Sequence, residues 1–353
     1  MSDFKVKEHK KFKKSNYSSF ILGVDVGGTN TTFGVFGLKD KLPLLLLSLH
    51  LETRKIKSMI NETNNVLFYV RKKYEISIKK ACYGVAGVVS YERRNAKITN
   101  GKLTIEKEDL LRNTKLEKIL IINDFEAIGY GINILDKKDI IIIKKAQKVL
   151  NAPIIVIGAG TGLGKTTLIY DEHSAFYIPI PSEAGHSDFA AQNEYELELI
   201  NFIKGYKKIK KNVSYEYVLS GQGLRNIYLF LRKKHTFNET KYTKEIDKTR
   251  NRAELISKYR KVDKTCKTVF EMFKTIYARF AKNFALDCLA FGGVYIAGGI
   301  SPKNIDIFDE GFVKIFQESH KMRNVLKKIP IYLILDCNIG LLGTSFAAFN
   351  YPK

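Results

Sequence analysis

A glycine-rich stretch at residues 157–167, IGAGTGLGKTT, has almost the composition of a phosphate-binding loop. A Walker A loop needs the spacing G-x-x-x-x-G-K-[ST], but the position five residues before Gly164 is Ala159, so the spacing fails by one residue. The G-x-G-x-x-G pattern of dinucleotide sites fails as well. Residues 165–170 are mostly β-branched or aromatic, which favours a strand over the helix that a Walker A loop opens. We therefore interpret the stretch as a glycine turn between two strands.

The same pattern, a glycine turn between two strands, occurs earlier in the chain. An apolar run at residues 19–26 leads into DVGGTN at residues 25–30, and strand-like residues resume at Thr31. The second turn follows about 130 residues later, and two similar strand-turn-strand units suggest two similar domains. Around them, hydrophobic periodicity predicts helices at residues 55–73, 269–288 and from 341, and strands at 81–89, 119–122, 294–297 and 331–335. This alternation indicates a mixed α/β protein.

Length and composition narrow the class further. The chain has 353 residues, more than the roughly 250 to 300 at which a single core stops growing, so we expect two domains. No apolar run reaches the roughly 18 residues of a membrane span. The four cysteines are far apart and form no C-x-x-C pair, which speaks against a structural zinc site and for a reducing, cytoplasmic location.

The net charge of +23 raises the question of nucleic-acid binding. The lysines are spread along the chain without a recognisable nucleic-acid motif, so we interpret them as a solvated basic surface and expect no nucleic-acid partner. Residues 1–18 are basic and lack the apolar segment of a secretion signal, and we expect a flexible tail there. The charged, lysine-rich segment at residues 236–264 is expected to be a surface excursion.

A set of motifs resembles one family. DVGGTN, INDFEA, GAGTGLG, SEAGHSDFA, YVLSGQGL, FGGVYIAGGIS and IGLLG occur in the order found in bacterial-type glucokinases, from about residue 21 to the C-terminus. The resemblance implies the two-domain actin-like ATPase fold, which is ribonuclease H-like, with a cleft between duplicated α/β domains. It implies a small domain of residues 19–134 plus 338–353 and a large domain of residues 135–337.

The resemblance also implies a reaction, the ATP-dependent phosphorylation of glucose at its 6-hydroxyl. Asp124 would be the general base, because it follows the strand at residues 119–122 and a carboxylate can accept the hydroxyl proton. The alternative is that Asp124 only caps the following helix. The resemblance implies that Asn123, Asp124, Glu183, His186 and Glu216 bind the sugar. Glu183 and His186 alone are too few ligands for zinc.

Glycines are expected to hold the nucleotide, since they let backbone N–H groups approach phosphate oxygens. The residues concerned are Gly27, Gly28, Thr29 and Asn30 in the first turn, Gly160, Thr161 and Gly162 in the second, and Gly298 and Gly299 in the adenosine motif. We expect Asp25 to hold Mg²⁺ through water, with Mg²⁺ and ATP as the cofactors. Lys165, which departs from the family pattern, is expected to point to solvent.

Two other functions stay open at this stage. The chain could be a kinase for another hexose such as fructose, mannose or glucosamine, or a sugar-binding regulator without catalysis. Related repressors carry an N-terminal helix-turn-helix domain, and the roughly 20 residues before the first strand are too few for one. The expected partners are glucose and ATP, without a membrane, and the assembly stays open between monomer and homodimer.

Overall fold

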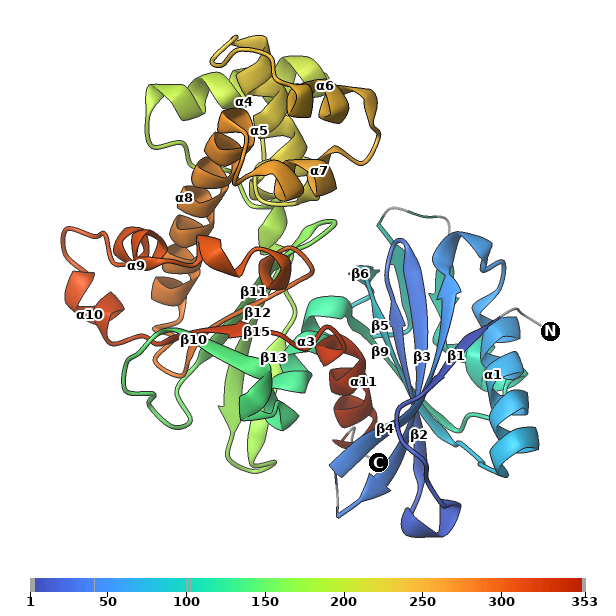
Figure 1. Ribbon diagram of the computed structural model, residues 1–353. Helices are drawn as coiled ribbons and strands as arrows, with labels where there is room; N and C mark the ends of the chain where they lie inside the picture. The colour runs from blue at the N-terminus through green and yellow to red at the C-terminus, as the bar shows by residue number, and fades with distance from the viewer. Residues whose placement is uncertain (1–3, 41, 100, 102, 351–353) are drawn as a thin grey trace. The chain divides into compact units, whose positions relative to one another are not determined.

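The computed structural model describes residues 4–40, 42–99, 101 and 103–350, which divide into two compact units (Figure 1). The first unit holds the described part of residues 1–137 together with residues 170–181 and the described part of 336–353. The second unit holds residues 138–169 and 182–335. Each unit is built on its own six-stranded sheet.

The sheet of the first unit has the strand order β1-β4-β3-β2-β5-β9. Its strands are β1 (Lys5–Glu8), β2 (Phe20–Val26), β3 (Asn30–Lys39), β4 (Leu42–Glu52), β5 (Lys80–Val85) and β9 (Lys118–Asn123). Strands β2 and β3 form an antiparallel hairpin, while β2, β5 and β9 run parallel. Val26 pairs with Val85 and Val85 with Asn123, so β2 and β9 end at the same edge of the sheet.

Helices cover both faces of this sheet (Figure 1). On one face, α1 (Met59–Tyr74) buries Val66 and Val70 in a cluster with alternate residues of β2 and β5. The other face packs against α3 (Asp124–Gly131) and α11 (Ile339–Asn350). A small sheet of β6 (Gly87–Val89), β7 (Asn95–Ile98) and β8 (Thr104–Glu106) adjoins α2 (Lys107–Asn113). Successive side chains of a strand point to opposite faces, and both faces are covered here, so almost every residue of β2, β5 and β9 is buried.

The second unit repeats the topology of the first. Its sheet has the strand order β10-β15-β14-β11-β12-β13, with β10 (Ile140–Lys144), β11 (Ile154–Ala159), β12 (Leu163–Asp171), β14 (Gly293–Ala297) and β15 (Ile331–Ile334). The last strand, β13 (Phe176–Ile180), and the last two residues of β12 group with the first unit. Again a strand pairs antiparallel with its hairpin partner, β11 with β12, and parallel with the next strand, β14. The strand-turn-strand duplication that the sequence predicts is therefore confirmed.

Helices make up most of the rest of the second unit. They are α4 (Glu194–Lys207), α5 (Gly221–Lys233), α6 (Lys241–Lys248), α7 (Arg252–Tyr259), α8 (Lys264–Asp287), α9 (Glu310–Phe316) and α10 (Arg323–Lys327). The long helix α8 contacts β11 and β14 and supplies much of one continuous apolar core. No helix within the described residues is long and apolar enough to cross a membrane.

Two expectations about surface segments are wrong. Residues 5–8 are not a free tail, because they form β1 and pair antiparallel with β4, whose outer backbone groups would otherwise lack partners. The segment at residues 236–264 is not a simple excursion either. It folds into α6 and α7, which bury Ile246 and Ile256 in the core of the second unit.

The division into units also differs from the predicted domains at residues 170–181. This segment, the end of β12 together with β13, groups with the first unit. The ring of Phe176 packs edge-on against Phe346 of α11 at 5.3 Å, and the Asn133 side chain exchanges hydrogen bonds with the backbone of Tyr177. These contacts explain why the segment belongs with α3 and α11.

Candidate active site

The first glycine turn joins β2 to β3 and is closed by its own backbone. Gly27 N–H donates to the Asn30 carbonyl at 3.0 Å, and a Cβ on Gly27 would lie 3.0 Å from that same oxygen. Gly28 and Thr29 are exposed, and a Cβ at Gly28 would meet nothing within 4 Å. The turn therefore presents open backbone on its outer side, as a phosphate-binding turn needs.

Asp25 lies one residue before the end of β2, partly buried beside the start of α11. A Cβ on Gly340 of that helix would lie 3.8 Å from the Asp25 carboxylate. Burial raises the pKa of this carboxyl to about 6, because desolvation disfavours the charged form. A bound cation would reverse that shift by favouring the carboxylate.

Asn123 and Asp124 form the junction of β9 and α3, at the same sheet edge as the first turn. Asn123 is the N-cap, and its side-chain oxygen accepts from Phe125 N–H at 2.8 Å. Its amide nitrogen donates to the Gly87 carbonyl at 3.2 Å. In the capping box the side-chain oxygen also accepts from the Glu126 N–H, so its two acceptor positions are filled. The amide nitrogen has two donors and keeps one of them for a sugar hydroxyl.

Asp124 is the first residue of α3 and is partly exposed. Its carboxylate accepts from Phe125 N–H at 3.0 Å, and the positive end of the helix favours the charged form. The cap of α3 is therefore mainly Asn123 and not Asp124. The Asp124 carboxylate lies beside it, at the sheet edge and at the start of the helix.

The second glycine turn joins β11 to β12 and is held by Glu216. The Gly160 N–H donates to the Gly162 carbonyl at 2.8 Å, and Leu163 N–H donates to the Glu216 carboxylate at 3.0 Å. A Cβ on Gly162 would lie 2.6 Å from that carboxylate, so any larger residue there would push the Glu216 side chain aside. Glu216 lies in the 3₁₀ helix at Tyr215–Tyr217, and the structure brings it to the turn rather than leaving it on a solvated helix.

Glu183 and His186 lie on the other side of Leu163. The 3₁₀ helix Ala184–His186 packs so closely that a Cβ on Gly185 would lie 1.9 Å from the Leu163 carbonyl. The carboxylate of Glu183 is 3.8 Å from the imidazole of His186, and about half of each side chain is exposed. Partial burial raises the pKa of Glu183; His186 opposes this, and the charge of Glu216 adds to it.

Gly298 and Gly299 lie against the second turn as well. Gly298 has a φ of 86°, which favours glycine, and a Cβ there would lie 2.6 Å from the Ala159 carbonyl. A Cβ on Gly160 would lie 3.8 Å from the backbone nitrogen of Gly299. In the second unit, the structure thus groups residues 160–162 and 298–299 with Glu216, and places Glu183 and His186 nearby.

Comparison with known proteins identifies the family. The family model described as Glucokinase matches residues 22–351. A glucokinase of Nostoc sp. is 32% identical over 345 residues, which cover 94% of this chain and 99% of that protein. The chain belongs to the glucokinase family.

Solved structures agree with the predicted fold of the glucokinase family. A glucokinase from an Antarctic psychrotroph is 25% identical, with a TM-score of 0.76 over 94% of this chain and 99% of that one. A ROK family glucokinase from Streptomyces griseus, in complex with glucose and AMPPNP, is 17% identical, with a TM-score of 0.65 over 94% and 99%. These likenesses confirm the two-domain, actin-like α/β fold.

The expectation that Lys165 points to solvent is wrong. Only 9% of its side chain is exposed, and its ammonium lies 5.0 Å from the centre of the Phe284 ring and 4.0 Å from the Asp287 carboxylate. Burial lowers its pKa, against the charge of Asp287. The cause is the strand itself, because Lys165 pairs with Ile157 in the middle of the hairpin and faces α8.

Several residues that support the candidate site are missing from the sequence-based prediction. Thr53 donates from its hydroxyl to the Gly27 carbonyl at 2.7 Å, and its N–H donates to the Thr29 carbonyl at 2.9 Å, so it holds the first turn from behind. Glu126 accepts from the N–H of Asn123 and completes a capping box with it. The N-x-x-E spacing could have revealed Glu126, but no sequence pattern indicates Thr53.

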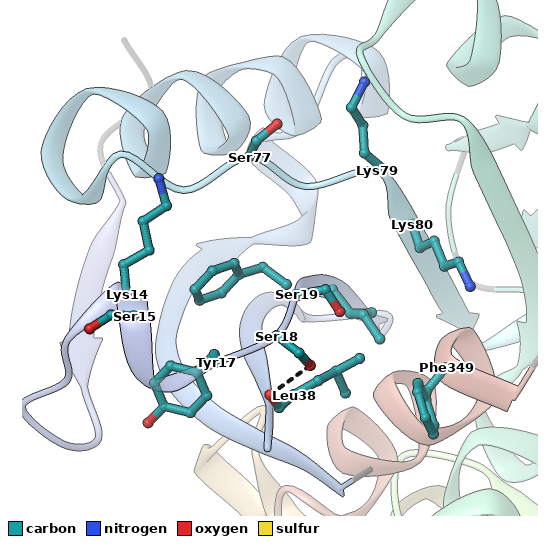
Figure 2. Close-up of a pocket in the computed structure, with 12 residues that line it drawn as sticks. Lys14, Ser15, Tyr17, Ser18, Ser19, Leu38, Ser77, Lys79, Lys80 and Phe349 are labelled. Atoms are coloured by element: carbon teal, nitrogen blue, oxygen red, sulfur yellow. Dashed lines mark hydrogen bonds between the residues drawn. The ribbon is translucent and has the colours of Figure 1, made fainter. Parts of the chain in front are cut away.

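A cavity of about 690 Å³ in the first unit contains none of the predicted site residues. It lies between the chain segment before β2 and the segment before β5, with Phe20 and Leu38 in its wall (Figure 2). The side chains of Lys14, Lys79 and Lys80 lie on separate sides of it and do not converge on one point (Figure 2). Shape alone therefore does not locate the site of a glucokinase in this chain.

Metal ligands are sparse. Within the described residues, no group of three or more His, Cys, Asp or Glu side chains could hold a metal ion. Mg²⁺ in kinases is held by one or two carboxylates with the phosphates and water completing its shell. The single carboxylate of Asp25, next to the first turn, fits that requirement.

Proposed function

We propose that this chain transfers the γ-phosphoryl group of ATP to the 6-hydroxyl of glucose, with Asp124 as the general base. The observation that carries the proposal is the position of Asp124 at a helix N-terminus, on the sheet edge where the first glycine turn also lies. The hydroxyl oxygen attacks the γ-phosphorus, its proton passes to the Asp124 carboxylate, and the bond to the leaving oxygen of ADP breaks.

In this proposal, Asn123, Glu183, His186 and Glu216 bind hydroxyls of the sugar. Asn123 offers an amide donor, and Glu183, His186 and Glu216 offer acceptors and a donor. The close packing of residues 183–186 and Glu216 around Leu163 supports a common role. Each hydroxyl that a wrong sugar fails to pair would cost about 1–3 kcal/mol, which is the basis for selecting one hexose.

The two glycine turns would bind the phosphates, the first through residues 27–30 and the second through residues 160–162, with residues 298 and 299 at the adenosine. Asp25 would hold Mg²⁺ through water, and the ion would neutralise phosphate charge when bound. The exposed backbone of Gly28 and Thr29 supports this assignment. A cytoplasmic location belongs to the proposal too, supported by four cysteines that form no disulfide.

The test is ADP release with ATP and Mg²⁺, using glucose beside fructose, mannose, glucosamine and N-acetylglucosamine. Asp124→Asn should lower kcat by about 10²- to 10⁴-fold, the usual contribution of a general base. Asp109→Asn is the matched control, because Asp109 is another first-turn aspartate, 46% exposed and paired with Arg112. Glucose binding, measured by calorimetry, should persist in both variants.

Four outcomes of this test distinguish the possible functions. Turnover with glucose that Asp124→Asn abolishes supports both the reaction and the base. Turnover with another hexose but not with glucose would identify that hexose as the substrate. Glucose binding without any turnover would indicate a regulator. A variant Asp124→Asn that keeps more than about a tenth of kcat would remove Asp124 from the role of base.

A further inference from the structure

The β6–β7 hairpin reaches the junction that carries Asn123 and Asp124. The turn of this hairpin contains Arg93, whose φ of 56° lies in the left-handed region that non-glycine residues rarely adopt. From there, the guanidinium donates to the Glu126 carboxylate at 2.7 Å, across 33 residues of sequence. The side chain of Glu126 is only 2% exposed, while that of Arg93 is 31% exposed.

Glu126 connects Arg93 to Asn123, the N-cap of α3. One carboxylate oxygen accepts from Arg93, and the other accepts from the N–H of Asn123 at 3.0 Å. The side chain of Asn123 in turn donates to the Gly87 carbonyl, in the first strand of the same hairpin. Two separate hydrogen-bonded links therefore tie the hairpin to the junction.

The charge of Arg93 stabilises the link from Arg93 through Glu126 to Asn123. A buried carboxylate is costly unless it is paired and hydrogen-bonded, and Arg93 is the cation that contacts Glu126 in this structure. A charged acceptor also makes a stronger hydrogen bond to Asn123 than a neutral one would. Without Arg93, the buried Glu126 carboxylate would lose its cation and be free to turn away from the N–H of Asn123.

We propose that Arg93 is a positioning residue for phosphoryl transfer: through Glu126 it fixes the orientation of Asn123 and Asp124 toward the sugar hydroxyl. This inference rests on the proposed function, in which those two residues contact the substrate. Small displacements of reacting groups have large effects on rate, since an error of about 1 Å can cost 10²-fold. A partly buried turn residue outside the motifs that carry the family resemblance thereby acquires a role in catalysis.

The first test compares Arg93→Met with Arg94→Met. Arg94 is the neighbouring arginine of the same turn, 68% exposed and paired with the exposed Glu92, so it controls for loss of charge and stem. Arg93→Met should lower kcat/KM for glucose by about 10- to 100-fold and leave KM for ATP within about twofold. Arg94→Met should match the wild type. Arg93→Lys should recover part of the loss, because it keeps the charge but not the two-pronged geometry.

A second variant separates positioning from simple stability. Arg93→Met combined with Glu126→Leu removes the buried charge as well as its partner, and such apolar replacements are often well tolerated. We expect the double variant to unfold at nearly the wild-type temperature while its kcat/KM for glucose stays low. Recovery of wild-type activity together with stability would overturn the proposal, as would an Arg93→Met enzyme that behaves like Arg94→Met.

Hydrogen exchange gives a readout that does not depend on turnover. Amide exchange at residues 121–127 should speed up in Arg93→Met and not in Arg94→Met, because the N–H of Asn123 loses its charged acceptor. If the wild type turned over no sugar, the proposed function would fail while this measurement still tested the link between Arg93 and the junction. Equal exchange in both variants would overturn the link.

Discussion

The packing of α3 against α11 makes one glycine decisive for the stability of the first unit. A Cβ added at Gly343 would lie 1.6 Å from the Ala127 carbonyl oxygen and 2.7 Å from the Gly131 nitrogen, both backbone atoms of α3. An ordinary carbon–oxygen contact is about 3.3 Å or more, so Gly343→Ala must push the helices apart by roughly 1.5 Å. Overpacking of this kind costs about 3 kcal/mol at the upper end of its usual range.

Alanine also favours the helix over glycine by about 1 kcal/mol, so the expected net loss is about 2 kcal/mol. The measurement is the free energy of unfolding in urea, followed by far-UV circular dichroism. Gly340→Ala in the same helix is the control, because its Cβ would meet only atoms at 3.6 and 3.8 Å, which is ordinary contact. It should raise the free energy of unfolding by up to about 1 kcal/mol, because it gains the helix preference of alanine without a clash.

Gly343→Ala should also displace the proposed general base, because α3 begins at Asp124. A shift of α3 by roughly 1.5 Å should lower glucose-dependent turnover by about 10- to 100-fold. A Gly343→Ala protein as stable as the wild type would refute the packing argument. A protein that loses stability as expected but keeps full turnover would refute the step from helix position to catalysis.

Three further predictions follow from contacts in the structure. Lys165→Met should leave the free energy of unfolding at pH 7 unchanged or raise it by up to about 1 kcal/mol, because it removes a desolvated ammonium, and KM for ATP should stay within about twofold. Gly162→Ala should lower kcat/KM for glucose about 10-fold, since its Cβ would displace the Glu216 carboxylate, 2.6 Å away. Burial lowers the pKa of both His9 and His50, so the folded state resists their protonation and stability should fall as the pH drops below about 6.5. His9→Gln should flatten that fall between pH 7 and pH 5 in urea unfolding, and an unchanged slope would contradict the assignment.

The sequence predicts the scaffold of the candidate site well, because the scaffold depends on local patterns. The apolar run before DVGGTN and the β-branched residues after GAGTGLG are enough to place both hairpins. The position of Asn123 and Asp124 at a strand end follows from the apolar residues before them. Hydrophobic alternation and glycine turns act over a few residues, so a single sequence reveals them.

The supporting contacts are hidden because they join distant segments. Arg93 meets Glu126 only because the β6–β7 hairpin folds back onto the end of β9, and nothing near residue 93 indicates that partner. Thr53 holds the first turn from 26 residues away. The prediction that Lys165 points to solvent is wrong for a different reason. Its charge suggests exposure, but its position in β12 buries the side chain.

The two glycine turns share a topology but are held by groups of different charge. Behind the first turn, the neutral hydroxyl and N–H of Thr53 bind the carbonyls of Gly27 and Thr29. At the second turn, the carboxylate of Glu216 accepts the N–H of Leu163, so a negative charge lies where phosphate would be repelled. A neutral sugar hydroxyl suffers no such repulsion. Glu216 therefore fits the sugar better than the nucleotide, and the phosphate proposed for the second turn would be bound by the backbone of residues 160–162 rather than beside this carboxylate.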